Sequence, residues 1–179
     1  MKEEECMRLE GKHVLNANRE TVWKMLLDPE VLAKTTPGVQ SLESTGNDTY
    51  NAVFAVKMGP VNGDFKGTMA VVDKVEPSEF TLKINMMGKI GTVNATGKLT
   101  LVAIGSHQTE VQFMGDAKLT GVLARTGQRV LNGVAKTMTQ QFFESLESEL
   151  EGTAPRSGLR AFFHRLWQTL KNIFSKQRR

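Results

Sequence analysis

The stretch VNGDFKGTMAVVDKV, residues 61–75, reads as one long β-strand and gives the first indication of the fold class. Apolar residues or glycines alternate here with polar residues: Val61, Gly63, Phe65, Gly67, Met69 and Val71 stand between Asn62, Asp64, Lys66 and Thr68. A period of two is typical of a strand that buries one face and exposes the other. The segment therefore predicts an antiparallel sheet with an apolar inner face.

Segments on both sides of this strand carry similar signals and are separated by turn-forming residues such as Gly59-Pro60 and Pro77-Ser78. The further strands predicted in this way are Met7–Asn16, Val39–Glu43, Thr49–Met58, Glu79–Met87, Val93–Ile104 and Thr109–Lys118. Together with residues 61–75 they make seven strands, which we expect to form a single antiparallel sheet.

Helical patterns lie before and after the main run of strands. Asn18 is placed to cap a short helix over Arg19–Leu27, and Asp28-Pro29 begins a second one over Glu30–Lys34. From Leu119 to Leu150 apolar residues recur at helical spacing, which predicts one long C-terminal helix. This order predicts an α+β helix-grip fold, in which a curved seven-stranded antiparallel sheet wraps on the long helix.

Such an arrangement can leave a space between sheet and helix. Gly63, Gly67, Gly97 and Gly115 add no volume at inward positions, and the nine methionines suit an adaptable apolar wall. These features favour a cavity for an apolar small molecule, although a packed core would give the same apolar stripe. The candidate ligand-binding residues are Phe54, Phe65, Met69, Leu82, Ile84, Met86, Val111, Phe113, Leu123, Val130, Val134 and Met138.

The C-terminal segment holds the basic excess of the chain. The whole sequence has 23 basic and 19 acidic residues, for a net charge of +4. Residues 152–179 contain seven of the basic residues and none of the acidic ones, which leaves 16 basic and 19 acidic residues before them. A mildly acidic main domain argues against nucleic-acid binding, because phosphate recognition needs a basic face.

Residues 159–179 read as a basic amphipathic helix. Its apolar face and basic flanks are Leu159, Phe162, Phe163, Leu166, Trp167, Leu170, Ile173 and Phe174, with Arg160, Arg165, Lys171 and Lys176. Aromatic side chains flanked by cations suit the boundary of an anionic bilayer. We expect this helix to lie on a membrane surface. A protein partner, or packing of the helix on its own domain, is the alternative.

Four regions follow from these patterns: an acidic N-terminal extension (1–6), the helix-grip domain (7–151), a linker (152–158) and the amphipathic helix (159–179). The N-terminus lacks the apolar core of a signal peptide, and no run is long and apolar enough to span a bilayer. The single cysteine, Cys6, excludes an internal disulfide. The sequence thus predicts a cytoplasmic protein, peripheral on the inner face of the cell membrane.

The sequence carries no recognisable catalytic motif. P-loop, dinucleotide-binding and nucleophile-elbow patterns are absent from it. His13, His107 and His164 fall on a strand, in a turn and in the tail, so they are not expected to converge as a triad or a metal site. We therefore expect a protein without enzyme activity and without a bound metal.

Three stretches resemble the G-subunit family of carbon monoxide dehydrogenase, within the START-like superfamily of polyketide cyclases and lipid-transfer domains. They are DPEVLAKTTPG (residues 28–38), GPVNGDFKG (residues 59–67) and LARTGQRVLNGVAKTMTQQFFESL (residues 123–146). The resemblance implies a START-like helix-grip fold over residues 7–150. It also implies a non-catalytic accessory protein of a molybdenum-containing dehydrogenase or another redox enzyme, attached to the membrane.

The START-like fold further implies an apolar ligand in the cavity. A lipid or a respiratory quinone, menaquinone or ubiquinone, would suit a protein that carries its ligand, without covalent attachment, between membrane and enzyme. Two alternatives remain open from the sequence. One is a membrane-recruitment adaptor with a filled core and no ligand, and the other is a cyclase- or hydrolase-type enzyme with polar groups inside the cavity.

Overall fold

Residues 4–152 are the part of the chain that the computed structural model describes, and their elements follow the predicted order. The elements are β1 (Glu4–Leu15), α1 (Arg19–Leu27), α2 (Pro29–Thr35), β2 (Val39–Gly46), β3 (Thr49–Met58), β4 (Val61–Val75), β5 (Glu79–Gly88), β6 (Gly91–Gly105), β7 (Gln108–Thr120), α3 (Val122–Arg125) and α4 (Gln128–Leu150). The bounds of β4, the strand with the clearest alternation, are those predicted from the sequence.

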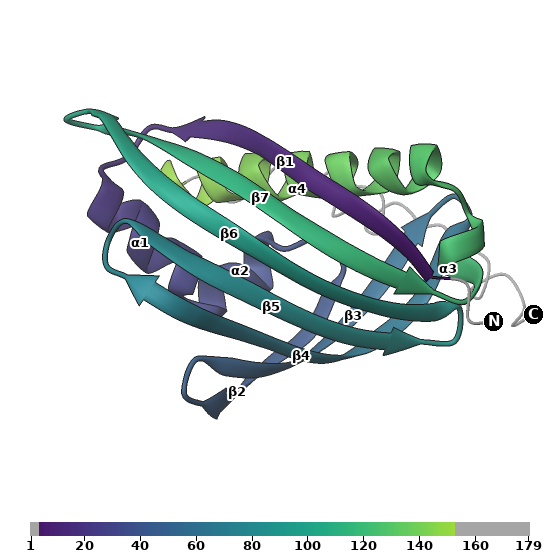
Figure 1. Cartoon of the computed structure of the whole chain (residues 1–179). Coiled ribbons are helices and arrows are strands. Elements are labelled where there is room, and N and C mark those ends of the chain that lie inside the picture. Colours follow the sequence, from purple (N-terminus) through teal and green to yellow (C-terminus); the bar gives the residue numbers. More distant parts are fainter. Residues whose placement is uncertain (1–3, 153–179) are drawn as a thin grey trace, which may run out of the picture.

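The strands form one seven-stranded antiparallel sheet in the order β1-β7-β6-β5-β4-β3-β2. Neighbouring strands pair over long registers, as between β1 and β7, where pairing runs from Glu4 opposite Thr120 to Leu15 opposite Thr109. Figure 1 shows the sheet curving around α4, with α1 toward one end of the sheet and α3 at the other. The predicted α+β helix-grip fold is therefore confirmed.

β1 begins earlier than the sequence predicts. Glu4–Cys6 pair with Lys118–Thr120 of β7, so the strand starts at Glu4 rather than at Met7. Half of the acidic extension assigned to residues 1–6 thus belongs to the sheet. Charged side chains such as that of Glu4 stay exposed on this edge strand, and an acidic composition therefore hid the pairing.

The prediction of a single helix over Leu119–Leu150 is wrong. Leu119 and Thr120 remain in β7, and the helical part divides into α3 and α4. Gly127, between the two helices, has a φ of 89°, a conformation that residues with a side chain rarely adopt. The break gives α4 a new start at Gln128, so its inward face is set independently of α3.

Gly67 allows β4 and β5 to approach closely where the sheet curves. A Cβ atom at Gly67 would collide with the carbonyl oxygen of Asn85 on the neighbouring strand, so no larger residue fits without moving the backbone. An inward glycine here adds no side-chain volume to the inner face, as the sequence pattern indicated.

Both short helices are capped as predicted. The Asn18 side chain accepts a hydrogen bond of 2.8 Å from the Thr21 amide, and that of Asp28 accepts one of 2.8 Å from the Glu30 amide. Pro29 occupies the first position of α2, where an amide proton would have no helical partner.

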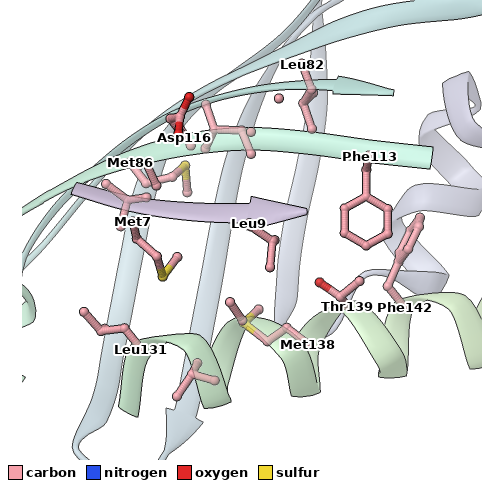
Figure 2. A pocket seen from close by; sticks show the side chains of 18 of the residues that line it. Met7, Leu9, Leu82, Met86, Phe113, Asp116, Leu131, Met138, Thr139 and Phe142 are labelled. Atoms are coloured by element: carbon pink, nitrogen blue, oxygen red, sulfur yellow. The ribbon is translucent and has the colours of Figure 1, made fainter. Parts of the chain in front are cut away.

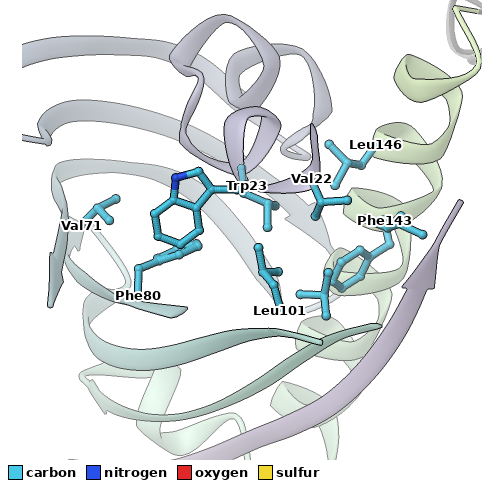
Figure 3. Close-up of a cluster of buried hydrophobic side chains, with 10 residues drawn as sticks. Val22, Trp23, Val71, Phe80, Leu101, Phe143 and Leu146 are labelled. Carbon is cyan, nitrogen blue, oxygen red and sulfur yellow. The ribbon is translucent and has the colours of Figure 1, made fainter. Parts of the chain in front are cut away.

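A tightly packed apolar cluster, here called the packed end, lies where α1 and the C-terminal half of α4 meet the sheet (Figure 3). Trp23 of α1 meets Phe80 of β5 edge to face, with their ring centroids 5.6 Å apart. The side chain of Leu146 on α4 is fully buried in it. The cluster consists of Leu15, Val22, Trp23, Leu26, Val71, Phe80, Leu101, Val111, Phe143 and Leu146.

Candidate functional site: an apolar cavity

A cavity of about 470 Å³ lies between the inner face of the sheet and α4, from Leu131 to Phe143. In Figure 2, Leu9 of β1 and Phe113 of β7 face Met138 and Phe142 of α4 across this space. A second apolar cluster, here called the open end, borders it. This cluster consists of Ala52, Val61, Phe65, Met86, Leu119, Leu123 and Leu131.

Four very small residues on β6 and β7 explain much of the empty volume. Ala95 pairs with Ala117 and Gly97 pairs with Gly115, so these residues form a block of neighbours on the sheet. All of them line the cavity. Opposite the sheet, α4 contributes the small side chain of Ala135. Since these residues project little from sheet and helix, a space remains between the two that side chains do not fill.

The structure brings nine of the twelve predicted ligand-binding residues together around this cavity. They are Phe54, Phe65, Leu82, Ile84, Met86, Phe113, Leu123, Val134 and Met138. They come from β3, β4, β5, β7, α3 and α4, and are collected by the curvature of the sheet. Their contact with a ligand stays a prediction.

The other three predicted residues lie elsewhere. Val111 is fully buried in the packed end, and Met69 packs beside the open-end cluster without lining the cavity. Val130 is 39 % exposed. A continuous helix would have put Val130 on the same face as Leu123, but the break at Gly127 turns Leu131 inward instead.

Several lining residues were not among the predicted ones. Met7 and Leu9 of β1 have the period of two that could have identified them. Gly97 and Gly115 were expected to face inward, whereas Ala95 and Ala117 carry little apolar signal. The remaining unpredicted lining residues are Thr36, Pro37, Val56, Val61, Val93, Ala95, Thr96, Gly97, Lys98, Leu99, Met114, Gly115, Asp116, Ala117, Leu119, Leu131, Ala135, Thr139, Phe142 and Phe143.

Charged residues beside the cavity turn their side chains to the outer face of the sheet. The Asp116 carboxylate accepts a hydrogen bond of 3.0 Å from Arg8, which raises the pKa of the Arg8 guanidinium. Lys98 pairs with Glu79 at 2.9 Å. Asp116 and Lys98 border the cavity through their backbone, next to Gly115 and Gly97, which have no side chains to cover it. The wall is therefore almost wholly apolar, with hydroxyl-bearing residues at Thr36 and Thr139. Thr96 also borders the cavity, but it is exposed and alternates along β6 with the inward Ala95 and Gly97.

His13 ties β1 to α4 beside the cavity. Its Nε2 lies 2.7 Å from Oε1 of Glu147, and its ring stacks on Phe143 with the centroids 4.5 Å apart. His107 lies in the turn between β6 and β7, at the edge of the sheet. Within residues 4–152, His13 and His107 are not part of any group of three or more His, Cys, Asp or Glu side chains that could hold a metal.

An apolar wall of this kind can remove an apolar molecule from water. In the stretch from Glu4 to Gly152, no helix is long and apolar enough to cross a bilayer. The residues predicted to bind the membrane, within 159–179, lie outside the described residues, as does the predicted linker beyond Gly152.

Comparison with known proteins places the chain in a family. The family model for CoxG, the G-subunit of carbon monoxide dehydrogenase, matches residues 11–151. The structure is also similar to the crystal structure of a conserved protein from Geobacillus kaustophilus. The two are 33% identical, with a TM-score of 0.79 over 82% of this chain and 96% of that one.

More distant structures share the fold alone. A START superfamily protein from Mycobacterium smegmatis is 14% identical, with a TM-score of 0.64 over 81% of this chain and 97% of that one. The ZhuI aromatase/cyclase from Streptomyces sp. R1128 is 13% identical, with a TM-score of 0.61 over 82% and 94%. Both neighbours support the START-like architecture.

One match among curated proteins covers only part of each chain. A protein of Ostreococcus tauri named cytochrome f is 28% identical over 112 residues, which is 58% of this chain. The chain spans about a third of that protein's length, 36%.

Proposed function

Because the chain belongs to the CoxG family of carbon monoxide dehydrogenase, we propose that it is a non-catalytic accessory protein that carries an apolar ligand between a membrane and a redox enzyme. The family name points to carbon monoxide dehydrogenase, or a related molybdenum-containing dehydrogenase, as the client. The proposed ligand is a respiratory quinone or a lipid.

The observation that carries this proposal is the apolar cavity. Its volume of about 470 Å³ falls within the range of roughly 300–1,000 Å³ that is usual for small-molecule sites. Each CH₂ group moved from water into such a site contributes about 0.8 kcal/mol. A ring with a few isoprene units, or part of an acyl chain, would therefore bind through burial alone.

The sequence of residues 159–179 supports the membrane part of the proposal. Its aromatic residues and cations match the two forces that hold a peripheral helix on an anionic bilayer, apolar burial and attraction to headgroups. A ligand with an isoprenoid or acyl chain is stored in the bilayer, so a carrier that rests there meets its ligand at high local concentration.

The end of the domain that bears α3 offers a further surface for the bilayer. The hairpins β3–β4 and β5–β6 lie at the same end of the sheet as α3 (Figure 1). Val122 is 54 % exposed there. Lys57 lies near the end of β3, Lys89 in the turn between β5 and β6, and Arg129 in the first turn of α4, and none of them forms an ion pair within residues 4–152. An exposed valine at the same end of the sheet as the hairpins with Lys57 and Lys89 fits an anionic lipid surface better than it fits water.

The two alternatives receive less support. An adaptor without ligand would be expected to have a filled core, whereas this domain has a cavity of about 470 Å³. A cyclase or hydrolase needs polar groups inside the cavity to move protons, and the wall has little besides the Thr36 and Thr139 hydroxyls.

Extraction of the purified full-length protein with organic solvent, followed by mass spectrometry, tests the ligand. We expect a quinone or lipid from the wild type, and much less of it from a Val134→Trp variant, in which the larger side chain enters the cavity. Val130→Trp is the matched control, because Val130 lies on the same helix outside the cavity wall. A clean extract from the wild type, together with no binding of added quinone or lipid, would favour the adaptor.

Liposome sedimentation tests the membrane. We expect the full chain to pellet with anionic vesicles more than with zwitterionic ones, and a chain ending at Gly152 to pellet much less. Equal sedimentation of the two chains would remove the role proposed for residues 159–179. Equal sedimentation with both vesicle types would remove the role of charge.

A further inference from the structure

Thr139 places a hydroxyl group on the cavity side of α4. It lines the cavity between Met138 and Phe142, and Figure 2 shows its oxygen turned from the helix toward the space that Leu9 and Phe113 border. The side chains around it are apolar. A threonine at this point is therefore a local exception in the wall.

This hydroxyl differs from other helical hydroxyls in the same molecule. Thr137, two positions earlier on α4, donates a hydrogen bond of 2.9 Å to the Gly133 carbonyl oxygen, and Thr126 donates one of 3.0 Å to that of Val122. A hydrogen bond to a carbonyl oxygen of the preceding turn is a common way for the hydroxyl of a helical threonine to find an acceptor. In the described residues, 4–152, the Thr139 hydroxyl has no such partner. Its donor is available to whatever occupies the cavity.

The position of Thr139 means that a hydrogen bond from its hydroxyl would orient a ligand along the cavity. Beyond it lie Phe113, Phe142 and Phe143, whose rings close the cavity toward the packed end. In the other direction the wall continues through Leu131 to α3. If the polar group of a ligand is bound at Thr139, that part of the ligand lies next to the phenylalanines. The rest of the ligand then extends toward the open end.

We propose that Thr139 donates a hydrogen bond to a carbonyl oxygen of an otherwise apolar ligand and so fixes its orientation in the cavity. This inference rests on the proposed function, because it assigns a role within the same ligand site. The chemical class is an apolar body with a carbonyl group. A quinone ring and the ester of an acyl chain both meet that description, whereas a pure hydrocarbon does not.

The test uses probes that differ in the carbonyl. Equilibrium dialysis measures the Kd of 2-methyl-1,4-naphthoquinone, of 2-methylnaphthalene and of methyl laurate for the full-length protein. Thr139→Val keeps the size of the side chain and removes the hydroxyl. Thr137→Val is the matched control, since its hydroxyl already bonds to Gly133, and Thr36→Val tests the other hydroxyl in the wall.

We expect Thr139→Val to weaken binding of the naphthoquinone by about three- to ten-fold, the usual effect of one neutral hydrogen bond. Binding of 2-methylnaphthalene should change little in any variant. If methyl laurate rather than the naphthoquinone loses affinity, the carbonyl belongs to an acyl ester and the role of Thr139 stands. Circular dichroism of each variant confirms that the fold is retained.

Other outcomes overturn the inference in distinguishable ways. If every probe binds Thr139→Val as it binds the wild type, the hydroxyl has no part in recognition, and the proposed carriage of an apolar ligand is unaffected. If the dependence on a carbonyl is lost in Thr36→Val instead, the donor is Thr36. If no probe binds the wild type, the failure lies with the proposed function itself.

Discussion

The two ends of this domain share one sheet and one helix, yet one end is filled and the other is hollow. At the packed end, α1 covers the sheet with Trp23, which packs on Phe80, and the C-terminal half of α4 contributes Phe143 and Leu146. At the open end no comparable helix is inserted among the described residues, and α4 faces the sheet with smaller residues such as Ala135. The same fold thus supplies a packed core and a cavity side by side.

Side-chain size on the sheet contributes to this contrast, together with the placement of α1 at one end. β6 and β7 run the length of the domain and remain paired throughout. They present Leu101 and Val111 to the packed end but Gly97 and Gly115 to the cavity. Stability should therefore depend mostly on the packed end, and ligand binding on the open end.

Truncation of one apolar side chain in each half of α4 tests whether the two ends differ in this way. We expect Leu146→Ala, which empties a fully buried position, to lower the free energy of unfolding by about 2–5 kcal/mol. Met138→Ala should cost less than about 1 kcal/mol, because Met138 already borders empty space. Urea unfolding measures both. Equal losses would mean that the cavity wall contributes as much to the core as the packed end does.

The glycine pair on β6 and β7 allows a finer test within the cavity wall. A Cβ atom on Gly115 would approach the Gly97 Cα and the Thr96 carbonyl oxygen to 2.8 Å, so Gly115→Ala should destabilise the protein by about 1–3 kcal/mol. A Cβ atom on Gly97 would meet its nearest neighbours at 3.8 Å. Gly97→Ala should therefore be neutral or stabilise the fold by up to about 1 kcal/mol. Thermal unfolding of the two variants checks the difference, and a reversed order would contradict it.

The contact between His13 and Glu147 fixes α4 at the packed end, and its energy should be modest. The two side chains are 33% and 42% exposed, so solvent weakens their attraction. We expect a coupling of about 0.5–1 kcal/mol in a double-mutant cycle of His13→Ala and Glu147→Ala, measured by urea unfolding at neutral pH. A coupling near zero would leave the stacking of His13 on Phe143 as the contribution of this residue.

Glu110, on the outer face of β7, should influence stability less than Leu146, Gly115 or His13. Hydrogen bonds from Gln112 and Lys12 lower the pKa of the Glu110 carboxyl. Its contribution to stability is thus present above the ordinary glutamate pKa of about 4.3 and is lost as the pH falls through the lowered value. Urea midpoints measured between about pH 3 and pH 6 should fall less steeply toward acid in Glu110→Gln than in the wild type. Parallel profiles would show that Glu110 is not linked to folding.

Much of the fold can be predicted from the sequence, because the buried face of a strand is visible in the alternation of its own apolar and polar residues. The alternation in Val61–Val75 and the caps at Asn18 and Asp28 depend on a few neighbouring residues, and these predictions agree with the structure. The start of β1 could not be predicted from neighbouring residues, since Glu4–Cys6 join the sheet by pairing with β7, which is distant in the sequence.

The site was harder to predict, because a cavity is defined by what is missing. Apolar periodicity identified Phe113 and Met138, but it could not separate Val111, which fills the packed end, from residues that face empty space. Apolar periodicity also predicted that Val130 faces inward. The structure has Val130 exposed, because the helix breaks at Gly127 and α4 presents a different face to the sheet. Small residues such as Ala95 carry no apolar signal, although their size does most to create the space.

The block of alanines and glycines on β6 and β7 leaves room for proteins of this plan to diversify. Ala95 and Ala117, and Ala135 on the helix opposite, border the cavity and lie outside the packed end, so we expect their side-chain volume to change without disturbing that cluster. Descendants of one ancestor could therefore acquire a wider, narrower or shorter chamber through single substitutions. The shape of the cavity can therefore change in such a lineage while the scaffold stays the same.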